Sequence, residues 1–279
     1  MSISKTQKHI SIIGAGKVGK ALYHAMTRAE LSVSLIEKSE AEQREATGLS
    51  DIVLLTVQDS MIETVCKLIA PFTKTGSIIA HCSGALSTQP LSLAKEHDCF
   101  TGTAHPLNTF PNEVAAQALL ENANHDTHCF ISGDNEATTE LTALFSSLGF
   151  KPSIIQDDGK IAYHAACVFL CNYLTSLSEI GLQTAELAGL DRQKFWQAVQ
   201  PLMRSTLDNI SMQGTQEALS GPIARADAST VTAHLNELSK APDVIESAYK
   251  TLGQQAIELA DAKGDLSAEQ INELREALS

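Results

Sequence analysis

A glycine-rich segment near the N-terminus has the spacing of a phosphate-binding turn. Gly14, Gly16 and Gly19 form a G-x-G-x-x-G pattern that directly follows a predicted strand and opens a predicted helix. In such turns the first glycine permits the tight bend, the second lets the backbone approach a pyrophosphate, and the third lets the helix pack close to the strand. The pattern therefore predicts that this turn, with Lys17 and Val18, binds the pyrophosphate of a dinucleotide.

The residues after the second predicted strand bear on which dinucleotide is bound. Glu37 lies about 20 residues beyond the glycines, where a carboxylate accepts hydrogen bonds from the ribose 2′-hydroxyl of NAD and repels the 2′-phosphate of NADP. Lys38 and Ser39 follow it, and these residue types suit a 2′-phosphate. Both NAD and NADP therefore stay open, with Glu37 favouring NAD.

Polar residues also lie at the ends of the later strands. In doubly wound sheets, ligands bind beyond the carboxyl ends of the strands, so we expect these residues to contact cofactor or substrate. The expected cofactor contacts are Val57, Gln58, His81 and Ser83, with His81 also near the substrate and His105 as a catalytic residue. A metal site of His81, Cys82 and His105 is conceivable, but the usual ligand spacings are absent and no metal is predicted.

One face of a later helix carries further reactive side chains. Lys160, His164, Cys167 and Cys171 are spaced by 4, 3 and 4 residues, which places them in a helical stripe roughly 60° wide. Reduction of a carbonyl or imine by hydride needs a proton donor, and Lys160 or His164 can supply it. Asn172 is expected to line the same crevice, whereas the two cysteines are expected to be core residues.

The elements that position these residues form two regions. Up to Gln156, short β-branched runs alternate with helical patterns, which indicates an α/β Rossmann-type parallel sheet in residues 1–156. The expected strands are 10–13, 32–36, 52–57, 77–81, 100–104, 128–132 and 152–156. Residues 157–279 read as an all-helical domain for substrate binding and dimerisation. The expected helices include 60–70 with a Ser60/Glu63 capping box, 160–188, 192–210 with Pro201 as a kink or restart, 229–238, 244–262, and 268–278 capped by Ser267 with Gln270.

Composition excludes several classes of partner. The net charge of −13 is shared by both halves, which disfavours nucleic acid and anionic membrane surfaces. No apolar run approaches the roughly 18 residues of a membrane span, and we expect a cytoplasmic protein. The six cysteines contain no C-x-x-C pair and are interpreted as reduced thiols.

Several segments together resemble a known group of proteins. The G-A-G-K-V-G turn, His81-Cys82-Ser83-Gly84, His105-Pro106-Leu107, Lys160-x-x-Tyr163-His164-Ala165-Ala166 and the loop Ser220 to Asp227 resemble a bacterial family of uncharacterised Rossmann-like proteins. The helical C-terminal half of that family is catalogued as a domain of unknown function. The chain is more distantly similar to pyrroline-5-carboxylate reductase and to the 3-hydroxyacid and 6-phosphogluconate dehydrogenases.

The resemblance implies NAD(P)-dependent reduction and a homodimer built by the helical domain. Lys160 matches the catalytic lysine of the hydroxyacid dehydrogenases, but His164 occupies the position of their asparagine. Relatives in the closer family often have a turn suited to NADP after the second strand, where this chain has Glu37-Lys38-Ser39.

These observations favour an NAD(P)-dependent oxidoreductase that reduces a C=O or C=N bond of a small metabolite. Arg225, in a Gly-Pro loop with Asp227 as the following helix cap, would hold a substrate carboxylate, unless it pairs with Asp227. The alternative is a non-catalytic module that senses the dinucleotide.

Overall fold

The computed structural model describes residues 8–37, 39–109 and 126–279. Contacts divide the chain into two compact units, Met1–Val168 and Phe169–Ser279. The boundary predicted from the sequence lies at Gln156, before the first helix of the helical region. That helix, α7 (Lys160–Cys167), falls in the first unit because the amine of Lys160 is bonded to groups at the ends of the sheet.

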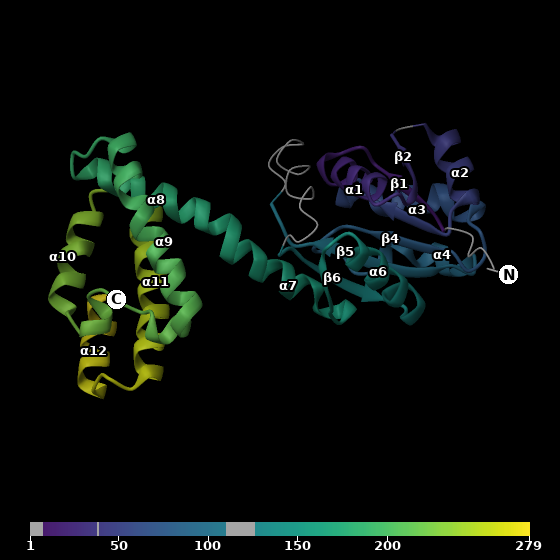
Figure 1. The fold of residues 1–279 in the computed structure, drawn as a ribbon. Helices are drawn as coiled ribbons and strands as arrows, with labels where there is room; N and C mark the ends of the chain where they lie inside the picture. The colour runs from purple at the N-terminus through teal and green to yellow at the C-terminus, as the bar shows by residue number, and fades with distance from the viewer. Residues whose placement is uncertain (1–7, 38, 110–125) are drawn as a thin grey trace. The chain divides into compact units, whose positions relative to one another are not determined.

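A seven-stranded, mostly parallel sheet forms the centre of the first unit (Figure 1). Its order is β2-β1-β3-β4-β5-β6-β7. The strands are β1 (His9–Ile13), β2 (Ser32–Ile36), β3 (Ile52–Leu55), β4 (Ile78–His81), β5 (Phe100–Pro106), β6 (His128–Gly133) and β7 (Lys151–Ile154). The α/β Rossmann-type prediction is confirmed. The prediction that the whole sheet is parallel is wrong, however, because β5 and β6 pair antiparallel. Periodicity indicates a strand but not its direction.

The sheet is buried on both faces because its central strands are almost entirely apolar. Alternate residues point to opposite faces, so Ile12 and Leu54 pack with one helical layer while Val53 packs with the other. The first layer contains α1 (Lys17–Arg28) and α6 (Asn135–Ser147). The second contains α3 (Asp59–Ile69) and α4 (Ser92–Glu96), and α2 (Glu40–Leu49) lies beside α3. The cap of α3 is Gln58 rather than the predicted Ser60/Glu63 box.

The second unit is helical, as predicted. It contains α8 (Tyr173–Leu187), α9 (Arg192–Glu217), α10 (Ala228–Leu238), α11 (Asp243–Lys263) and α12 (Ala268–Ala277). The capping box of Ser267 and Gln270 is confirmed, and Asp227 caps α10. Helix α9 continues past Pro201, and Gly214 is the residue that departs from helical geometry.

One helical run was not anticipated as a membrane-span candidate. Residues Asp157–Leu187 form a helix long and apolar enough, by length and composition, to cross a membrane, with a mean hydropathy of 1.4 in its most apolar window. The prediction from the sequence concerned continuous apolar runs, whereas this helix qualifies by its average hydropathy. Small polar residues interrupt the apolar ones, so no continuous run is visible although the average is high.

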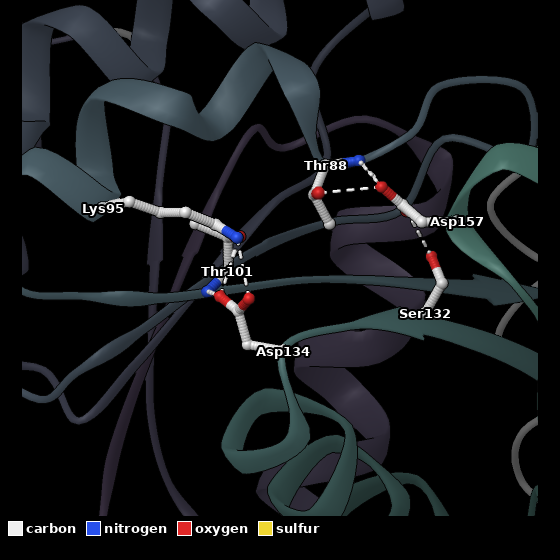
Figure 2. A network of polar contacts seen from close by, with 6 residues as sticks. All are labelled: Thr88, Lys95, Thr101, Ser132, Asp134 and Asp157. Carbon is white, nitrogen blue, oxygen red and sulfur yellow. Dashed lines mark hydrogen bonds and ion pairs between the residues drawn. The ribbon is translucent and has the colours of Figure 1, made fainter.

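Partly buried carboxylates join the strand ends of the first unit (Figure 2). Asp157 accepts hydrogen bonds from Thr88 N at 3.1 and 3.0 Å, Thr88 Oγ1 at 2.8 Å and Ser132 Oγ at 2.7 Å. Burial alone raises the pKa of Asp157, but these bonds and the charge of Lys160 outweigh it and lower the pKa below its ordinary value. The loop after β4 is thereby fixed to β6.

Replacing Asp157 by Asn should test this junction. An amide offers one acceptor oxygen and no charge, so we expect the free energy of unfolding at pH 7 to fall by about 1 to 3 kcal/mol. The neighbouring exposed Asp158→Asn should change it by less than about 0.5 kcal/mol. Because the folded-state pKa of Asp157 is depressed, its contribution is full above the unfolded pKa near 3.9 and is lost as pH falls through the folded value. Urea denaturation checks both variants, and equal stabilities would contradict the assignment.

Candidate functional site

The glycine turn follows β1 at the point where the strand order reverses, between β1 and β3. Gly14 has a φ of +116°, and a Cβ there would lie 2.8 Å from the carbonyl carbon of Thr56. The hydroxyl of Thr56 donates to Gly14 O at 2.6 Å, and a Cβ on Gly19 would lie 2.0 Å from that same oxygen. Both positions therefore require glycine for close packing of the turn, β3 and α1.

Gly16 differs from the other two glycines. It is exposed, its φ is −75°, and a Cβ would meet only Thr56 O at 3.9 Å. It precedes α1, which begins at the exposed Lys17 with no side-chain cap, while Val18 packs against the core. The folded chain tolerates a side chain at Gly16, so the fold itself does not demand this glycine. The geometry suits the close approach of an anion to the helix N-terminus.

The tip of β2 places Glu37 in solvent, one residue after Ile36. Lys38 lies outside the described residues. Ser39 caps α2 and accepts a hydrogen bond from Glu42 N at 3.3 Å. Val57 is partly buried and the cap residue Gln58 is exposed. Because β3 is parallel to β1, both residues follow β3 at the same edge of the sheet as the glycine turn.

The loop after β4 is held by its own side chains. His81 is fully buried, accepts from Ser83 N at 3.2 Å through Nδ1, and donates through Nε2 to Ser87 O at 2.9 Å. Ser83 Oγ donates to Asp59 at 2.8 Å and accepts from the backbone of Ala85 and Leu86. Both ring nitrogens of His81 are therefore occupied, and it shapes the loop instead of offering a nitrogen to cofactor or substrate. Burial lowers the pKa of His81 to about 4, so its imidazole is neutral at pH 7.

Lys160 lies beneath this loop. Its side chain is 1% exposed, and its amine donates to Ser83 O at 2.9 Å and to Thr103 Oγ1 at 2.8 Å. Burial lowers the pKa of Lys160 to about 8, although the negative charges of Asp157 and Asp59 act to raise it. Lys160 thus joins β4, β5 and α7 and directs two of its hydrogens to structural acceptors. Burial also raises the pKa of the nearby Cys82 thiol to about 12.

Three aromatic side chains meet beside Gly84. His105 Nδ1 lies 2.7 Å from Tyr163 OH, and the rings of His105 and His164 are 6.4 Å apart. A Cβ on Gly84 would lie 2.8 Å from His164 Nδ1 and 2.9 Å from His105 Nε2. Two imidazole nitrogens therefore converge on one point. Within the described part of the chain, His164 Nδ1 is buried without a hydrogen-bond partner.

Two other predicted site residues, Asn172 and Arg225, belong to the second unit. Asn172 is exposed and ends the π-helical turn Val168–Asn172, which also contains Cys171. Asn172 and Cys171 belong to the second unit. The π turn breaks the 3.6-residue period on which the predicted stripe depends. Arg225 also lies in the second unit, in a 3₁₀ turn before Asp227, whose pKa is lowered to about 2 by hydrogen bonds from Thr230 and Ser229 and by the charge of Arg225.

Several residues that hold the site together were not predicted from the sequence. Thr103, Ser132 and Asp157 hold the buried network, and Tyr163 bonds to His105. Tyr163 stood in a recognised motif, but the other three carried no signal because single polar residues at strand ends are common. No group of three or more His, Cys, Asp or Glu side chains that could hold a metal ion occurs among the described residues.

Comparisons place this geometry in a known fold. Residues 127–256 match the family described as Domain of unknown function (DUF2520). No curated protein is similar enough in sequence to match it.

The chain is similar in structure to protein TM1727 from Thermotoga maritima (TM-score 0.70, 21% identity, 91% of this chain and 99% of that one). It is similar to an imine reductase from Pseudomonas sp. (TM-score 0.63, 17% identity, 98% and 100% covered). It is also similar to an imine reductase from Myxococcus stipitatus in complex with NADP⁺ (TM-score 0.67, 14% identity, 97% and 100% covered). At these identities the likeness shows a shared fold, and the resemblance to Rossmann-like proteins with a helical C-terminal domain is confirmed.

The buried neutral state of His81 makes stability depend on pH. Its folded-state pKa is about 4, whereas free histidine titrates near 6.5. Between these values the unfolded chain binds a proton that the folded chain does not, so stability falls as pH drops. We expect His81 to contribute a loss of about 2 kcal/mol between pH 7 and pH 5.

Denaturant unfolding of wild type and His81→Gln across this pH range measures the effect. The variant should show a shallower loss of stability, whatever its stability at pH 7. His128→Gln, which removes an exposed imidazole, should retain the wild-type slope. An unchanged slope in His81→Gln would show that the buried ring is not the group responsible.

Proposed function

We propose that the protein is an NAD(P)-dependent oxidoreductase that reduces a C=O or C=N bond of a small metabolite. The observation that carries the proposal is the turn from Gly14 to Gly19. Gly14 and Gly19 are required by packing, whereas Gly16 is exposed beside an uncapped helix N-terminus at the switch point of the sheet. The neighbours named as imine reductases share this fold and support the same class of chemistry.

The charges around the tip of β2 favour NAD over NADP. Glu37 is followed by Glu40 and Glu42 in the first turn of α2, and Arg44 is paired with Glu40 at 3.3 Å. A 2′-phosphate would approach these carboxylates. The Myxococcus stipitatus imine reductase is named in complex with NADP⁺ and its V8 variant in complex with NAD⁺, so the shared fold accommodates either.

The residues of this chain would orient the substrate and supply the proton. A bound nicotinamide cofactor supplies the hydride. Lys160 positions the β4 loop through Ser83 O, because its buried amine already has two protein acceptors. His164 is the better proton donor, since its buried Nδ1 has no partner among the described residues and lies beside His105 Nε2.

Cofactor binding tests the proposal directly. Fluorescence titration should show that wild type binds NADH, and NADPH roughly ten- to hundredfold more weakly because Glu37 repels the 2′-phosphate. Gly16→Val should weaken NADH binding at least about tenfold by blocking the pyrophosphate. Its melting temperature should match wild type, since a Cβ at Gly16 meets only Thr56 O at 3.9 Å.

The outcomes separate the alternatives. Failure of wild type to bind either cofactor below millimolar concentration would remove the proposal. Tighter binding of NADPH would show that Glu37 faces away. Turnover is followed by loss of reduced cofactor with cyclohexanone, with and without allyl amine, and with ethyl 5-oxohexanoate, compounds named in complexes of the similar reductive aminase from Aspergillus terreus. Binding without turnover of any substrate tried would favour the sensor.

We also propose that the helical unit forms a homodimer. Helix α9 has no buried residue over its 26 residues, and Leu202, Leu207 and Met212 are 67%, 53% and 73% exposed. An apolar cavity of about 840 Å³ lies within the same unit, between α8, α10 and α11. Large apolar side chains left exposed along a helix that buries none of its residues are consistent with a surface that another chain covers.

The long apolar helix Asp157–Leu187 is also less suited to a membrane than to a protein partner. The first part of the apolar run, up to Val168, belongs to the first unit. The remainder carries Glu179 and Glu186, both paired with Arg192. Charges at these positions are costly in a bilayer core. We therefore propose a cytoplasmic homodimer that binds neither membrane nor nucleic acid.

Light scattering at micromolar concentration should return the mass of a dimer. Leu202→Glu should shift the mass to that of a monomer, because a carboxylate cannot be buried in an apolar interface without a partner. Leu49→Glu is the matched control, since Leu49 is 68% exposed but lies in α2 of the first unit. A monomer mass for wild type would overturn the dimer, and a dimer mass for Leu202→Glu would overturn the placement of its interface on α9.

A further inference from the structure

Tyr163 is held firmly against His105. Its hydroxyl lies 2.7 Å from His105 Nδ1. The Tyr163 ring packs on Phe130 with centroids 4.6 Å apart and meets His105 edge-on at 5.7 Å. The hydroxyl is therefore fixed by ring packing as well as by its hydrogen bond.

The protonation states decide which partner donates. Burial lowers the pKa of His105 to about 4, aided by the charge of Lys160 and by His164, so its ring is neutral at pH 7. Burial raises the pKa of Tyr163 above its ordinary value, so the phenol keeps its proton. The other contact of the hydroxyl is Cys167, whose sulfur is a weak acceptor compared with an imidazole nitrogen. The O–H therefore donates to His105 Nδ1, which leaves the ring hydrogen on Nε2.

That nitrogen faces the convergence point described above. His164 Nδ1 and His105 Nε2 lie 2.8 and 2.9 Å from the position that a Cβ on Gly84 would occupy. The absence of a side chain at Gly84 leaves room for both nitrogens. A neutral imidazole with a fixed Nε2–H is a directed hydrogen-bond donor toward whatever atom approaches His164.

We propose that Tyr163 is a positioning residue that holds His105 in its Nε2–H tautomer, so that His105 orients the substrate heteroatom that His164 protonates. The inference rests on the proposed function. In the reduction, a C–H bond forms at the carbon from the cofactor hydride, the π electron pair moves to the heteroatom, and the proton from His164 completes the new O–H or N–H bond. His105 keeps its proton throughout, and solvent reprotonates His164.

Nitrogen NMR of the ligand-free protein tests the tautomer without any substrate. Histidine ring nitrogens are labelled with ¹⁵N, and the His105 signals are identified by their loss in His105→Gln. In wild type we expect Nε2 protonated and Nδ1 unprotonated. In Tyr163→Phe, which keeps the ring on Phe130, we expect a mixture of tautomers. Tyr173→Phe, in an exposed tyrosine of α8, should leave His105 unchanged.

A kinetic measurement extends the test. Tyr163→Phe should bind NADH as wild type does, and its turnover of a carbonyl from the panel above should fall about tenfold to a hundredfold. A wild-type His105 protonated at Nδ1, or an unchanged His105 spectrum in Tyr163→Phe, would overturn the inference. Lack of cofactor binding by wild type would instead count against the proposed function, because the NMR result does not depend on it.

Discussion

The buried amine of Lys160 is the interaction on which the strand ends depend. Transferring an ammonium group from water into a protein interior is costly unless its hydrogens find acceptors. Here two of them bond to Ser83 O and Thr103 Oγ1, and Thr103 in turn is 2.9 Å from Ser132 Oγ. Ser132 donates to Asp157, which supplies the nearby negative charge. One chain of polar contacts thus sets the relative positions of β4, β5, β6 and the start of α7.

This arrangement separates positioning from chemistry. Lys160 and His81 form hydrogen bonds that fix the loop of residues 82–88. Gly84 is part of this loop. His105 Nε2 and His164 Nδ1 also lie close to this loop, beside Gly84. His164 Nδ1 forms no hydrogen bond with any described residue. Glycine at position 84 is required because a Cβ would collide with both imidazoles. The hydrogen bonds of His81 and Lys160 therefore hold the loop, and glycine at position 84 leaves room for the two imidazole rings.

Much of the fold could be predicted from local patterns. The strand β2 was predicted residue for residue, and the Ser267/Gln270 capping box formed as its spacing indicated, because both depend on neighbours in the chain. The antiparallel pairing of β6, the π turn at Val168–Asn172 and the bond between Tyr163 and His105 were not predictable in the same way. Tyr163 and His105 are 58 residues apart in sequence, and only the packing of α7 on the sheet brings them together. The helical stripe of Lys160, His164 and Cys167 was predicted from its spacing. The spacing did not reveal that Lys160 is buried and bonded to structural acceptors, whereas His164 keeps a ring nitrogen without a described partner.

The charge of Lys160 also determines what the imidazoles can do. It lies close enough to lower the pKa of both His81 and His105, adding to the larger effect of burial. A protonated His105 beside this ammonium would be unfavourable, so near neutral pH the ring acts through its N–H hydrogen bond and not as an imidazolium. A neutral donor of fixed direction stabilises charge that develops on a substrate heteroatom without transferring a proton itself. The same buried amine that holds the loop in place therefore assigns proton transfer to His164, the ring with a buried nitrogen for which the described residues provide no other partner.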